Sequence, residues 1–349
     1  MTTAKKTRDS NIELLRIVAM LLVLIVHTGF FTIGEPTNSE LISDPVKSTM
    51  RYFMQALSIT CVNLFVLISG WFGIRPKTNR FLEFIFQIFF FLGILYLIFY
   101  FINPADWPLW ESLKSTLMIS TQRYWFIKAY ILLYLLSPVL NAYIDRADPK
   151  QFRWLLIGFF AFQFVYGWYY GAVTYFDRGY STLSFIGLYL LSRFVNLHSD
   201  KLKNLSLWTD LAIWFGFTLI TTTLGVLFNY KTGIGDVRFY YYNSPFVVGA
   251  SLFLFLAFYK IKFQSKIVNW IGVSAFAAYL LHSNVAFMTD VYCPVLKSVY
   301  SAYSYPTYIA FSMAFVLVIF IVAILVDKIR IAIWNVLVKM INKKSKRSV

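Results

Sequence analysis

Apolar runs of about twenty residues alternate with short polar stretches along almost the whole chain. A helix of about 20 apolar residues is long enough to cross the hydrocarbon core of a bilayer, because it rises 1.5 Å per residue. The pattern therefore predicts an all-α, polytopic integral membrane protein with ten transmembrane helices. The predicted spans are 12–33, 56–74, 81–102, 125–144, 154–171, 181–197, 207–229, 243–259, 267–289 and 307–327.

The distribution of lysine and arginine predicts the side of the membrane that each loop faces. With the N-terminus inside, the cytoplasmic stretches carry 22 of the 32 basic residues and the outer stretches carry 9. Cytoplasmic loops of membrane proteins are enriched in Lys and Arg, so both termini are predicted to be cytoplasmic. The predicted cytoplasmic loops are 75–80, 145–153, 198–206 and 260–266, and the outer ones include 34–55, 103–124, 230–242 and 291–306.

The composition supports a membrane protein without a separate soluble domain. The chain has 349 residues, of which 59% are hydrophobic and 14% are charged, whereas soluble domains carry about 25% charged residues. We predict one transmembrane domain over residues 1–330 and a basic tail over 331–349, consisting of an interfacial helix and a disordered cytoplasmic end. The first apolar run is too long for a signal peptide, and no small-residue cleavage site follows His27.

The net charge and the cysteine content argue against nucleic-acid and metal binding. The net charge of +16 reflects topology and attraction to the anionic lipid bilayer, and no nucleic-acid recognition module is visible. The two cysteines, Cys61 and Cys293, give neither a disulfide framework nor the spacing of metal ligands. We therefore expect no nucleic-acid partner, no bound cofactor and no metal.

Arg16 and His27 stand out because both are ionisable and both fall in the first predicted span. An ionisable side chain at membrane depth is costly and indicates a functional site. Their spacing of eleven residues is close to three helical turns, so both side chains point the same way, roughly 16 Å apart along the axis. An arginine can hold phosphate in a bidentate manner, and a histidine is a natural general base or acid. Together they could hold the two ends of a long, thin, anionic substrate.

Each of these residues also has a plainer interpretation. His27 could be a buried histidine that hydrogen-bonds to a neighbouring helix. Arg16 could be an anchor that reaches the membrane interface, or the partner of Glu13 in an i,i+3 ion pair. His282, in the ninth predicted span, is expected at a similar depth to His27, and the two could share a cavity if these spans are neighbours.

Further polar residues are candidates to support chemistry or to bind a donor. Asn63, Ser69, Tyr279 and Asn284 could donate hydrogen bonds to a developing oxyanion, and Ser69 with Gly70 could instead allow close helix packing. Arg75, Lys77 and Arg80 follow the second span and could grip a polyphosphate donor, or they could simply be part of the topology signal.

Four segments together resemble the acyltransferase-3 family of bacterial membrane O-acyltransferases. They are Ile12–Arg16 leading to His27, Asn63–Phe65 with Ile68–Gly70, Tyr124–Phe126 with Tyr134, Leu135, Ser137 and Pro138, and Tyr279–His282. They occur in the order of the family, and the family's ten spans agree with the independently predicted topology.

The resemblance implies transfer of an acyl group, usually acetyl, from cytoplasmic acyl-CoA to a hydroxyl of an extracytoplasmic or lipid-linked glycan. It implies that His27 is the base that deprotonates the acceptor and that Arg16 is its key companion. Arg75 and Arg80 stand near the position of a basic pair in the family. Here four residues, including Lys77, lie between the two arginines, whereas the gap in the family is only two residues. It also implies a bacterial plasma-membrane enzyme whose substrates are acyl-CoA and a glycan, with the oligomeric state open.

Two other classes of function remain open at the level of sequence. A transporter or flippase for a lipid-linked sugar would also have many spans and buried polar groups. A membrane scaffold without chemistry would not explain why Arg16 and His27 are aligned. The Trp, Tyr and Asn residues of the outer loops could bind sugars or could anchor the protein at the membrane interface.

Overall fold

The computed structural model of the chain describes residues 8–102, 108, 110, 124–171 and 173–345. Every regular element in this described part is a helix, as the sequence predicted. The chain divides into two compact units, the first made of residues 1–75 and 125–272 and the second of residues 76–124 and 273–349. The predicted outer loop 103–124 lies almost wholly outside the described residues.

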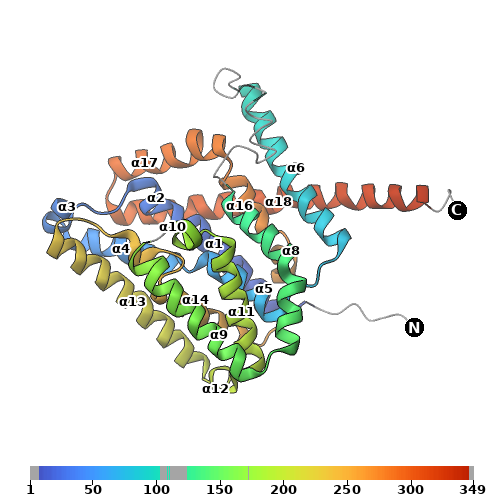
Figure 1. Cartoon of the computed structure of the whole chain (residues 1–349). Helices are drawn as coiled ribbons and strands as arrows, with labels where there is room; N and C mark the ends of the chain where they lie inside the picture. The colour runs from blue at the N-terminus through green and yellow to red at the C-terminus, as the bar shows by residue number, and fades with distance from the viewer. Residues whose placement is uncertain (1–7, 103–107, 109, 111–123, 172, 346–349) are drawn as a thin grey trace. The chain divides into compact units, whose positions relative to one another are not determined.

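The first unit contains most of the helices. Its tightest packing joins α13 to α14, which Figure 1 shows side by side, and α5 to α11. Helix α1 packs on α5, α14 and α15. The elements of the unit are α1 (Ser10–Thr28), α2 (Phe30–Ile33), α3 (Asn38–Ser43), α4 (Pro45–Ser58), α5 (Cys61–Phe72), α8 (Trp125–Arg146), α9 (Pro149–Phe162), η1 (Gln163–Tyr169), α10 (Val173–Phe176), η2 (Asp177–Gly179), α11 (Thr182–His198), α12 (Asp200–Lys203), α13 (Leu207–Thr232), η3 (Val237–Tyr240), α14 (Pro245–Lys260) and α15 (Lys266–Gly272).

The second unit is built on two long helices and a broken segment. The elements that the structure describes in it are α6 (Thr78–Ile102), α16 (Phe276–His282), η4 (Phe287–Tyr292), α17 (Cys293–Ala302) and α18 (Tyr305–Ser345). Helix α18 is continuous over 41 residues, so no break marks residue 331, where the tail was predicted to begin. The division into a domain 1–330 and a tail 331–349 stays a prediction.

A buried polar cluster joins α6 to α18 within the second unit. Asp327 is fully buried and accepts hydrogen bonds from Gln87 Nε2 (2.9 Å) and Arg330 Nε (2.9 Å). Arg330 also pairs with Glu83 (3.3 Å). A buried charge is tolerated only when it is paired and hydrogen-bonded, so these four side chains are best explained as a linked structural set.

The number of spans is only partly confirmed. Among the described residues, seven helices are long and apolar enough to cross a membrane, and the pair Lys266–His282 and Phe287–Ala302, bent by 78°, brings the number to eight if it counts as one span. The predicted span 181–197 corresponds to α11, which has only 17 residues. The predicted span 154–171 is divided between α9, with 14 residues, and the π-helical η1. Helix α11 is as long as the predicted span, but at 17 residues it is shorter than a helix of about 20 that crosses the hydrocarbon core. In the other region, α9 and η1 follow each other directly and share the predicted span between them.

Local capping explains where several helices begin. Asp148 accepts hydrogen bonds from the backbone N–H groups of Lys150 and Gln151, and Pro149 follows at the first helical position of α9. Ser206 caps α13 in the same way through Thr209. A side-chain oxygen at this position satisfies a backbone donor that has no partner inside the helix, and this fixes the start of the helix.

Gly70 allows α5 and α11 to pack closely. A Cβ atom at Gly70 would lie 2.4 Å from the carbonyl oxygen of Tyr189, which is closer than van der Waals contact permits. Ser192 on α11 donates to the carbonyl of Leu67 on α5 (2.6 Å) at the same contact. Small residues let helix backbones approach in membranes, so this outcome supports the packing interpretation of Gly70.

Loops that the charge distribution assigned to the cytoplasm bond to one another in the first unit. The backbone N–H of Ser265 donates to the hydroxyl of Ser10 (2.9 Å), and Lys260 donates to the carbonyl of Leu202 (3.4 Å). These contacts join the start of α1 to the loop after α14, and that helix to the segment before α13. Segments that bond to each other outside the bilayer must lie on the same side of the membrane, and these contacts agree with that requirement.

Two predicted outer loops bond to the ends of predicted spans in the first unit. Arg238, in the predicted outer loop 230–242, donates to the carbonyl of Tyr169 (2.9 Å), near the end of the predicted span 154–171. Asn229, the last residue of the predicted span 207–229, donates to the carbonyl of Pro36 (2.7 Å) in the predicted outer loop 34–55. The side of the membrane that each loop faces stays a prediction.

Cysteine labelling tests this orientation. After replacement of Cys61 and Cys293, Ser39→Cys is expected to react with an impermeant thiol reagent added to intact cells, because Ser39 is exposed in a predicted outer segment. Thr78→Cys, exposed in a predicted cytoplasmic turn, is expected to react only after permeabilisation. The cysteine-free protein is the control, and the reverse labelling pattern would invert the topology.

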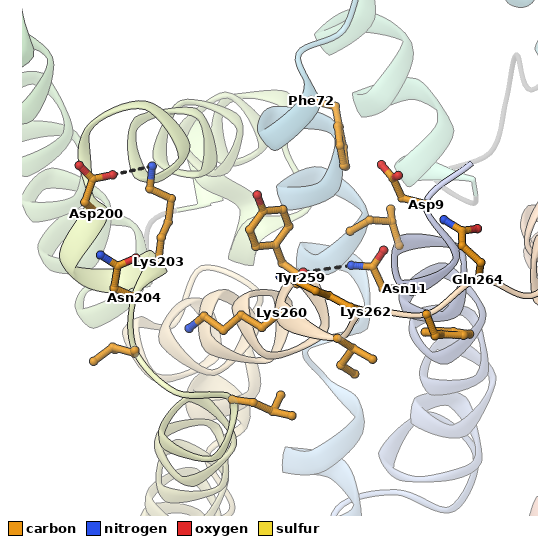
Figure 2. Close-up of a pocket in the computed structure, with 15 residues that line it drawn as sticks. Asp9, Asn11, Phe72, Asp200, Lys203, Asn204, Tyr259, Lys260, Lys262 and Gln264 are labelled. Carbon is orange, nitrogen blue, oxygen red and sulfur yellow. Dashed lines mark hydrogen bonds and ion pairs between the residues drawn. The ribbon is translucent and has the colours of Figure 1, made fainter. Parts of the chain in front are cut away.

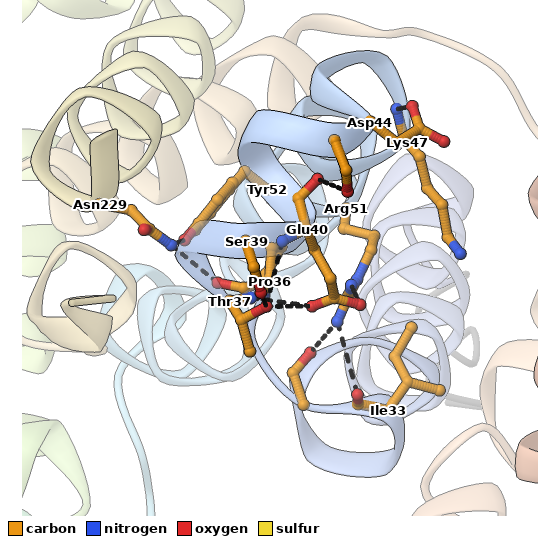
Figure 3. A network of polar contacts seen from close by, with 12 residues as sticks. Ile33, Pro36, Thr37, Ser39, Glu40, Asp44, Lys47, Arg51, Tyr52 and Asn229 are labelled. Carbon is orange, nitrogen blue, oxygen red and sulfur yellow. Dashed lines mark hydrogen bonds and ion pairs between the residues drawn. The ribbon is translucent and has the colours of Figure 1, made fainter. Parts of the chain in front are cut away.

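The segment between α2 and α4, residues 34–44, is held by a buried arginine and is called the strap below. Arg51, on α4, is 3% exposed and donates to the carboxylate of Glu40 (3.0 Å) and to the carbonyl of Gly34 (2.8 Å). Figure 3 shows its guanidinium group beside Glu40, with Tyr52 and Asn229 on the other flank of the strap. Within this strap, the Thr37 and Glu40 side chains form a reciprocal capping box that starts α3.

Two carboxyl groups of the strap are shifted in opposite directions. Burial raises the pKa of Glu35, and the nearby Asp236 adds to this, while the Tyr52 hydroxyl and Arg51 only partly offset it. Burial alone would raise the pKa of Glu40, but the Thr37 backbone N–H and Arg51 outweigh it and lower that pKa.

The opposite shifts predict opposite effects of neutral replacements on stability. The folded state holds the Glu35 proton more tightly than the unfolded state, so this carboxyl reduces stability as the pH rises from about 4.5 through its raised pKa. Glu35→Gln is expected to raise the unfolding temperature at pH 8, with the gain disappearing toward pH 4.5. Glu40→Gln, its matched control, is expected to lower it at pH 8, because the ionised carboxylate is the stabilised form. Thermal unfolding in detergent across this pH range measures both, and equal responses of the two variants would contradict the prediction.

Candidate active site

Arg16 and His27 lie on the same helix, α1, as the sequence predicted. Arg16 is on the second turn, and its side chain is about one third exposed (35%). His27 is on the last turn and is half-buried. The helix is continuous between them, so their separation along the axis is about 16 Å at a rise of 1.5 Å per residue.

Glu13 organises the basic end of α1. Its carboxylate oxygen Oε1 accepts from Arg16 (2.6 Å) and from Arg8 (3.0 Å), and its side chain is only 4% exposed. A Cβ atom at Gly272 would lie 2.5 Å from Glu13 Oε2, so the glycine makes room for the carboxylate. The predicted i,i+3 pair of Arg16 and Glu13 is therefore present. It holds the guanidinium at a fixed place on the helix, while the Arg16 side chain as a whole stays about one third exposed.

Ser69 and Tyr130 form a polar contact near Arg16. Their hydroxyl oxygens are 3.1 Å apart, and Ser69 also donates to the carbonyl of Phe65 (2.9 Å). Ser69 has a single hydroxyl hydrogen and uses it in the bond to the Phe65 carbonyl. Tyr130 is therefore the donor in the hydrogen bond between Tyr130 and Ser69. Arg16 interacts electrostatically with Tyr130. The structure thus brings Arg16 from α1, Ser69 from α5 and Tyr130 from α8 into one neighbourhood.

Tyr130 is the member of this group that sequence reasoning missed. Its only signal is a tyrosine within the fourth predicted span, five residues after Trp125. The hydroxyl of a tyrosine in such a span needs a polar partner, which could have marked it. Its partner Ser69 is 61 residues away along the chain, so the pair could not be recognised from spacing.

The tautomer of His27 follows from its hydrogen bond. His27 Nδ1 lies 2.6 Å from the carbonyl oxygen of Val23, one turn earlier on α1. A carbonyl oxygen cannot donate, so Nδ1 carries the proton and the neutral ring has its lone pair on Nε2. The ring also stacks edge-on against Phe31 (5.1 Å between centroids). These contacts fix the ring and define Nε2 as its basic atom.

His282 has the same hydrogen bond in the second unit. Its Nδ1 lies 2.9 Å from the carbonyl oxygen of Ala278, and its side chain is fully buried. Tyr279 and Tyr292 lie beside it, with ring centroids at 6.0 Å and 5.9 Å. His282 ends α16, and His27 belongs to the other unit, so a cavity shared by the two histidines stays a prediction.

Asn284 and Asn63 each bond to the backbone through one amide atom, while Asn284 Nδ2 and Asn63 Oδ1 are buried without a hydrogen-bond partner among the described residues. The side-chain oxygen of Asn284 accepts from the backbone N–H of Phe287 (3.2 Å), where the chain resumes a helix after the break at His282. The amide of Asn63 is fully buried and donates to the carbonyl of Tyr242 (2.9 Å). Both bonds have structural roles, and the predicted role of these amides at an oxyanion stays a prediction.

The basic turn after the second predicted span is exposed. Arg75, Lys77 and Arg80 are all exposed, as a group that meets a soluble anion must be. Arg75 ends the first unit, and Lys77 and Arg80 belong to the second. Their predicted contact with a polyphosphate donor stays a prediction.

The helices and the ionisable groups on α1 define a multi-pass membrane protein with a candidate site inside its first unit. The family model described as an acyltransferase domain, that of the acyltransferase-3 family, matches residues 9–328, which is nearly the whole chain. The chain therefore belongs to this family, and the membership supports a membrane acyltransferase. Neither a curated protein nor a solved structure matches the chain.

Proposed function

We propose that this protein is a membrane-bound O-acyltransferase of the bacterial plasma membrane. It transfers an acyl group, which we propose to be acetyl, from cytoplasmic acyl-CoA to a hydroxyl of an extracytoplasmic or lipid-linked glycan. The single observation that best supports this proposal is the hydrogen bond of His27 Nδ1 to the Val23 carbonyl, because it leaves the lone pair on Nε2 of a histidine inside a membrane helix. Family membership supports the reaction class.

In the proposed reaction His27 acts first as a base and then as an acid. Nε2 takes the proton of the acceptor hydroxyl while that oxygen attacks the carbonyl carbon of the thioester. The tetrahedral intermediate collapses with cleavage of the C–S bond, and the imidazolium returns the proton to the departing thiolate. The products are the O-acyl glycan and CoA with a free thiol, so protons and electrons balance without another reactant.

Arg16 has a separate role in this proposal, at the donor. Its guanidinium is anchored by Glu13 through one N–H group, and the side chain is about one third exposed, so further N–H donors remain for an anionic or carbonyl group. A guanidinium forms stronger hydrogen bonds with phosphate than neutral donors do. The neighbouring Tyr130 and Ser69 hydroxyls extend the same polar surface.

Incubation of purified protein with radiolabelled acetyl-CoA tests the proposal. We expect release of free CoA that depends on an added glycan acceptor, and label that appears in the glycan. Mass spectrometry of surface polysaccharides from cells with and without the gene identifies the acceptor. Movement of a lipid-linked sugar across proteoliposomes without CoA release would instead support a flippase.

A further inference from the structure

A polar pocket lies at the N-terminal end of α1, away from His27. It has a volume of about 1090 Å³ and is lined entirely by residues of the first unit. Four separate segments form it: residues 9–12 of α1 and its cap, Phe72 at the end of α5, residues 200–207 around α12, and residues 259–264 after α14. Three of the segments belong mainly to stretches predicted to be cytoplasmic, and Phe72 lies in the predicted span 56–74, close to its predicted cytoplasmic end.

The cationic groups of the pocket come from two of these segments. Lys203 lies in one, and Lys260 and Lys262 lie in the other. Lys203 is paired with the exposed Asp200 (2.8 Å), and Lys260 with the buried Asp210. Lys262 is exposed and forms no ion pair among the residues that the structure describes. An exposed ammonium group on a long side chain is suited to meet a phosphate from solution.

Aromatic and amide side chains accompany the lysines. Tyr259 rests on Trp71, with ring centroids 4.5 Å apart, and Phe72 is nearly half exposed at the pocket. Figure 2 shows Lys203 and Asn204 on one side of Tyr259, and Asp9 and Gln264 on the other. Exposed aromatic side chains with lysines nearby are suited to bind a base joined to phosphates.

Asn11 connects the pocket to the helix that carries the candidate catalytic groups. Its side-chain amide donates to the carbonyls of Phe258 (3.2 Å) and Tyr259 (3.0 Å), which binds the start of α1 to the pocket wall. From Asn11, Arg16 is about 7 Å along the axis and His27 about 24 Å, at 1.5 Å per residue. A ligand held in the pocket by one end therefore needs a long arm to reach His27.

We propose that this pocket binds the nucleotide end of the acyl donor, through its phosphate groups and its adenine ring. The inference rests on acyl-CoA being the donor, which is part of the proposed function. CoA has the required shape, because a phosphorylated adenosine is joined to the thioester by a long flexible arm. Lys203 and Lys262 contact the phosphates, Tyr259 and Phe72 contact the adenine, and the arm follows α1 past Arg16 toward His27.

The test compares binding of CoA and of adenosine 3′,5′-bisphosphate to purified protein in lipid nanodiscs. The double variant Lys203→Gln with Lys262→Gln is expected to weaken both ligands by about tenfold, since a charged hydrogen bond is worth about 1.5–3 kcal/mol. Lys266→Gln is the matched control, because Lys266 is exposed nearby but does not line the pocket. Lys260 is left in place, since its replacement would leave the buried Asp210 carboxylate without its ion-pair partner.

Equal affinity in the wild type and the double variant, or an equal loss in Lys266→Gln, would overturn the proposal. A loss of binding to phosphatidylglycerol vesicles without a loss for CoA would also overturn it, by assigning the lysines to lipid phosphate. In transfer assays, the double variant is expected to raise the KM for acetyl-CoA and to leave kcat unchanged. Absence of transfer by a wild type that binds CoA would contradict the proposed function and leave the pocket assignment intact.

Discussion

Replacement of His27 by alanine is expected to lower the rate of acyl transfer by at least about 10²-fold, since general acid–base catalysis contributes roughly 10²–10⁴-fold. The reason is that Nε2 is the proton acceptor that the Val23 hydrogen bond defines, and alanine has no such atom. The measurement is release of CoA by purified protein in nanodiscs, with the acceptor glycan present. Binding of CoA is expected to be unchanged, because the proposed nucleotide pocket lies about 24 Å away along α1.

Controls separate loss of chemistry from loss of folding. The unfolding temperature and the monodispersity of His27→Ala in detergent should match the wild type, because His27 is only half-buried. In the wild type, kcat should fall when the pH is lowered, because the base acts only when it is deprotonated. This pH dependence should be absent from the residual activity of the variant. Wild-type transfer by a well-folded His27→Ala protein would exclude His27 as the base.

The second large effect is expected at Arg16. Arg16→Ala is expected to raise the KM for acetyl-CoA by about tenfold or more, because charged hydrogen bonds of about 1.5–3 kcal/mol are removed. Arg16→Lys should be intermediate, since an ammonium keeps the attraction but loses the planar fork of donors. Steady-state kinetics with varied acetyl-CoA provide the measurement.

The ion pair of Arg16 with Glu13 provides the decisive control. Lysine at position 16 can still pair with Glu13, so Arg16→Lys preserves this structural contact and tests donor recognition alone. Glu13→Gln removes the anchor and leaves the guanidinium in place, and a smaller rise in KM is expected. If Arg16→Ala and Arg16→Lys both keep the wild-type KM, Arg16 is an interfacial anchor and a partner of Glu13, without a role at the donor.

The class of fold could be predicted from apolar runs because helix formation in a bilayer is a local requirement. Every backbone group in the hydrocarbon must be bonded within its own segment, so a long apolar run is sufficient to indicate a helix. The limits of the helices could not be predicted so well. Helix α4 starts at Pro45, where Asp44 caps it, although the predicted span begins at residue 56. Helix α9 ends before the predicted span does, and α11 has only 17 residues, so the number of spans is not confirmed as ten.

The alignment of Arg16 with His27 was predictable for the same reason. Eleven residues of one continuous helix place two side chains on one face, whatever surrounds them. The ion pair of Arg16 with Glu13, which is three residues away, also follows from helical periodicity. Family membership was likewise evident from short motifs, because each motif lies within a single segment.

Contacts between distant segments required the folded structure. Tyr130 meets Ser69 across 61 residues, Gly272 makes room for Glu13, and the proposed nucleotide pocket combines four segments between residues 9 and 264. In none of these contacts are the residues three or four positions apart, which is the spacing that makes side chains neighbours on one helix. They depend on which helices pack together, and that choice depends on the shapes of many side chains at once, such as the close approach of α5 and α11 at Gly70. Local periodicity was therefore enough for the helices and for the line from Arg16 to His27, whereas packing determined which polar groups surround that line.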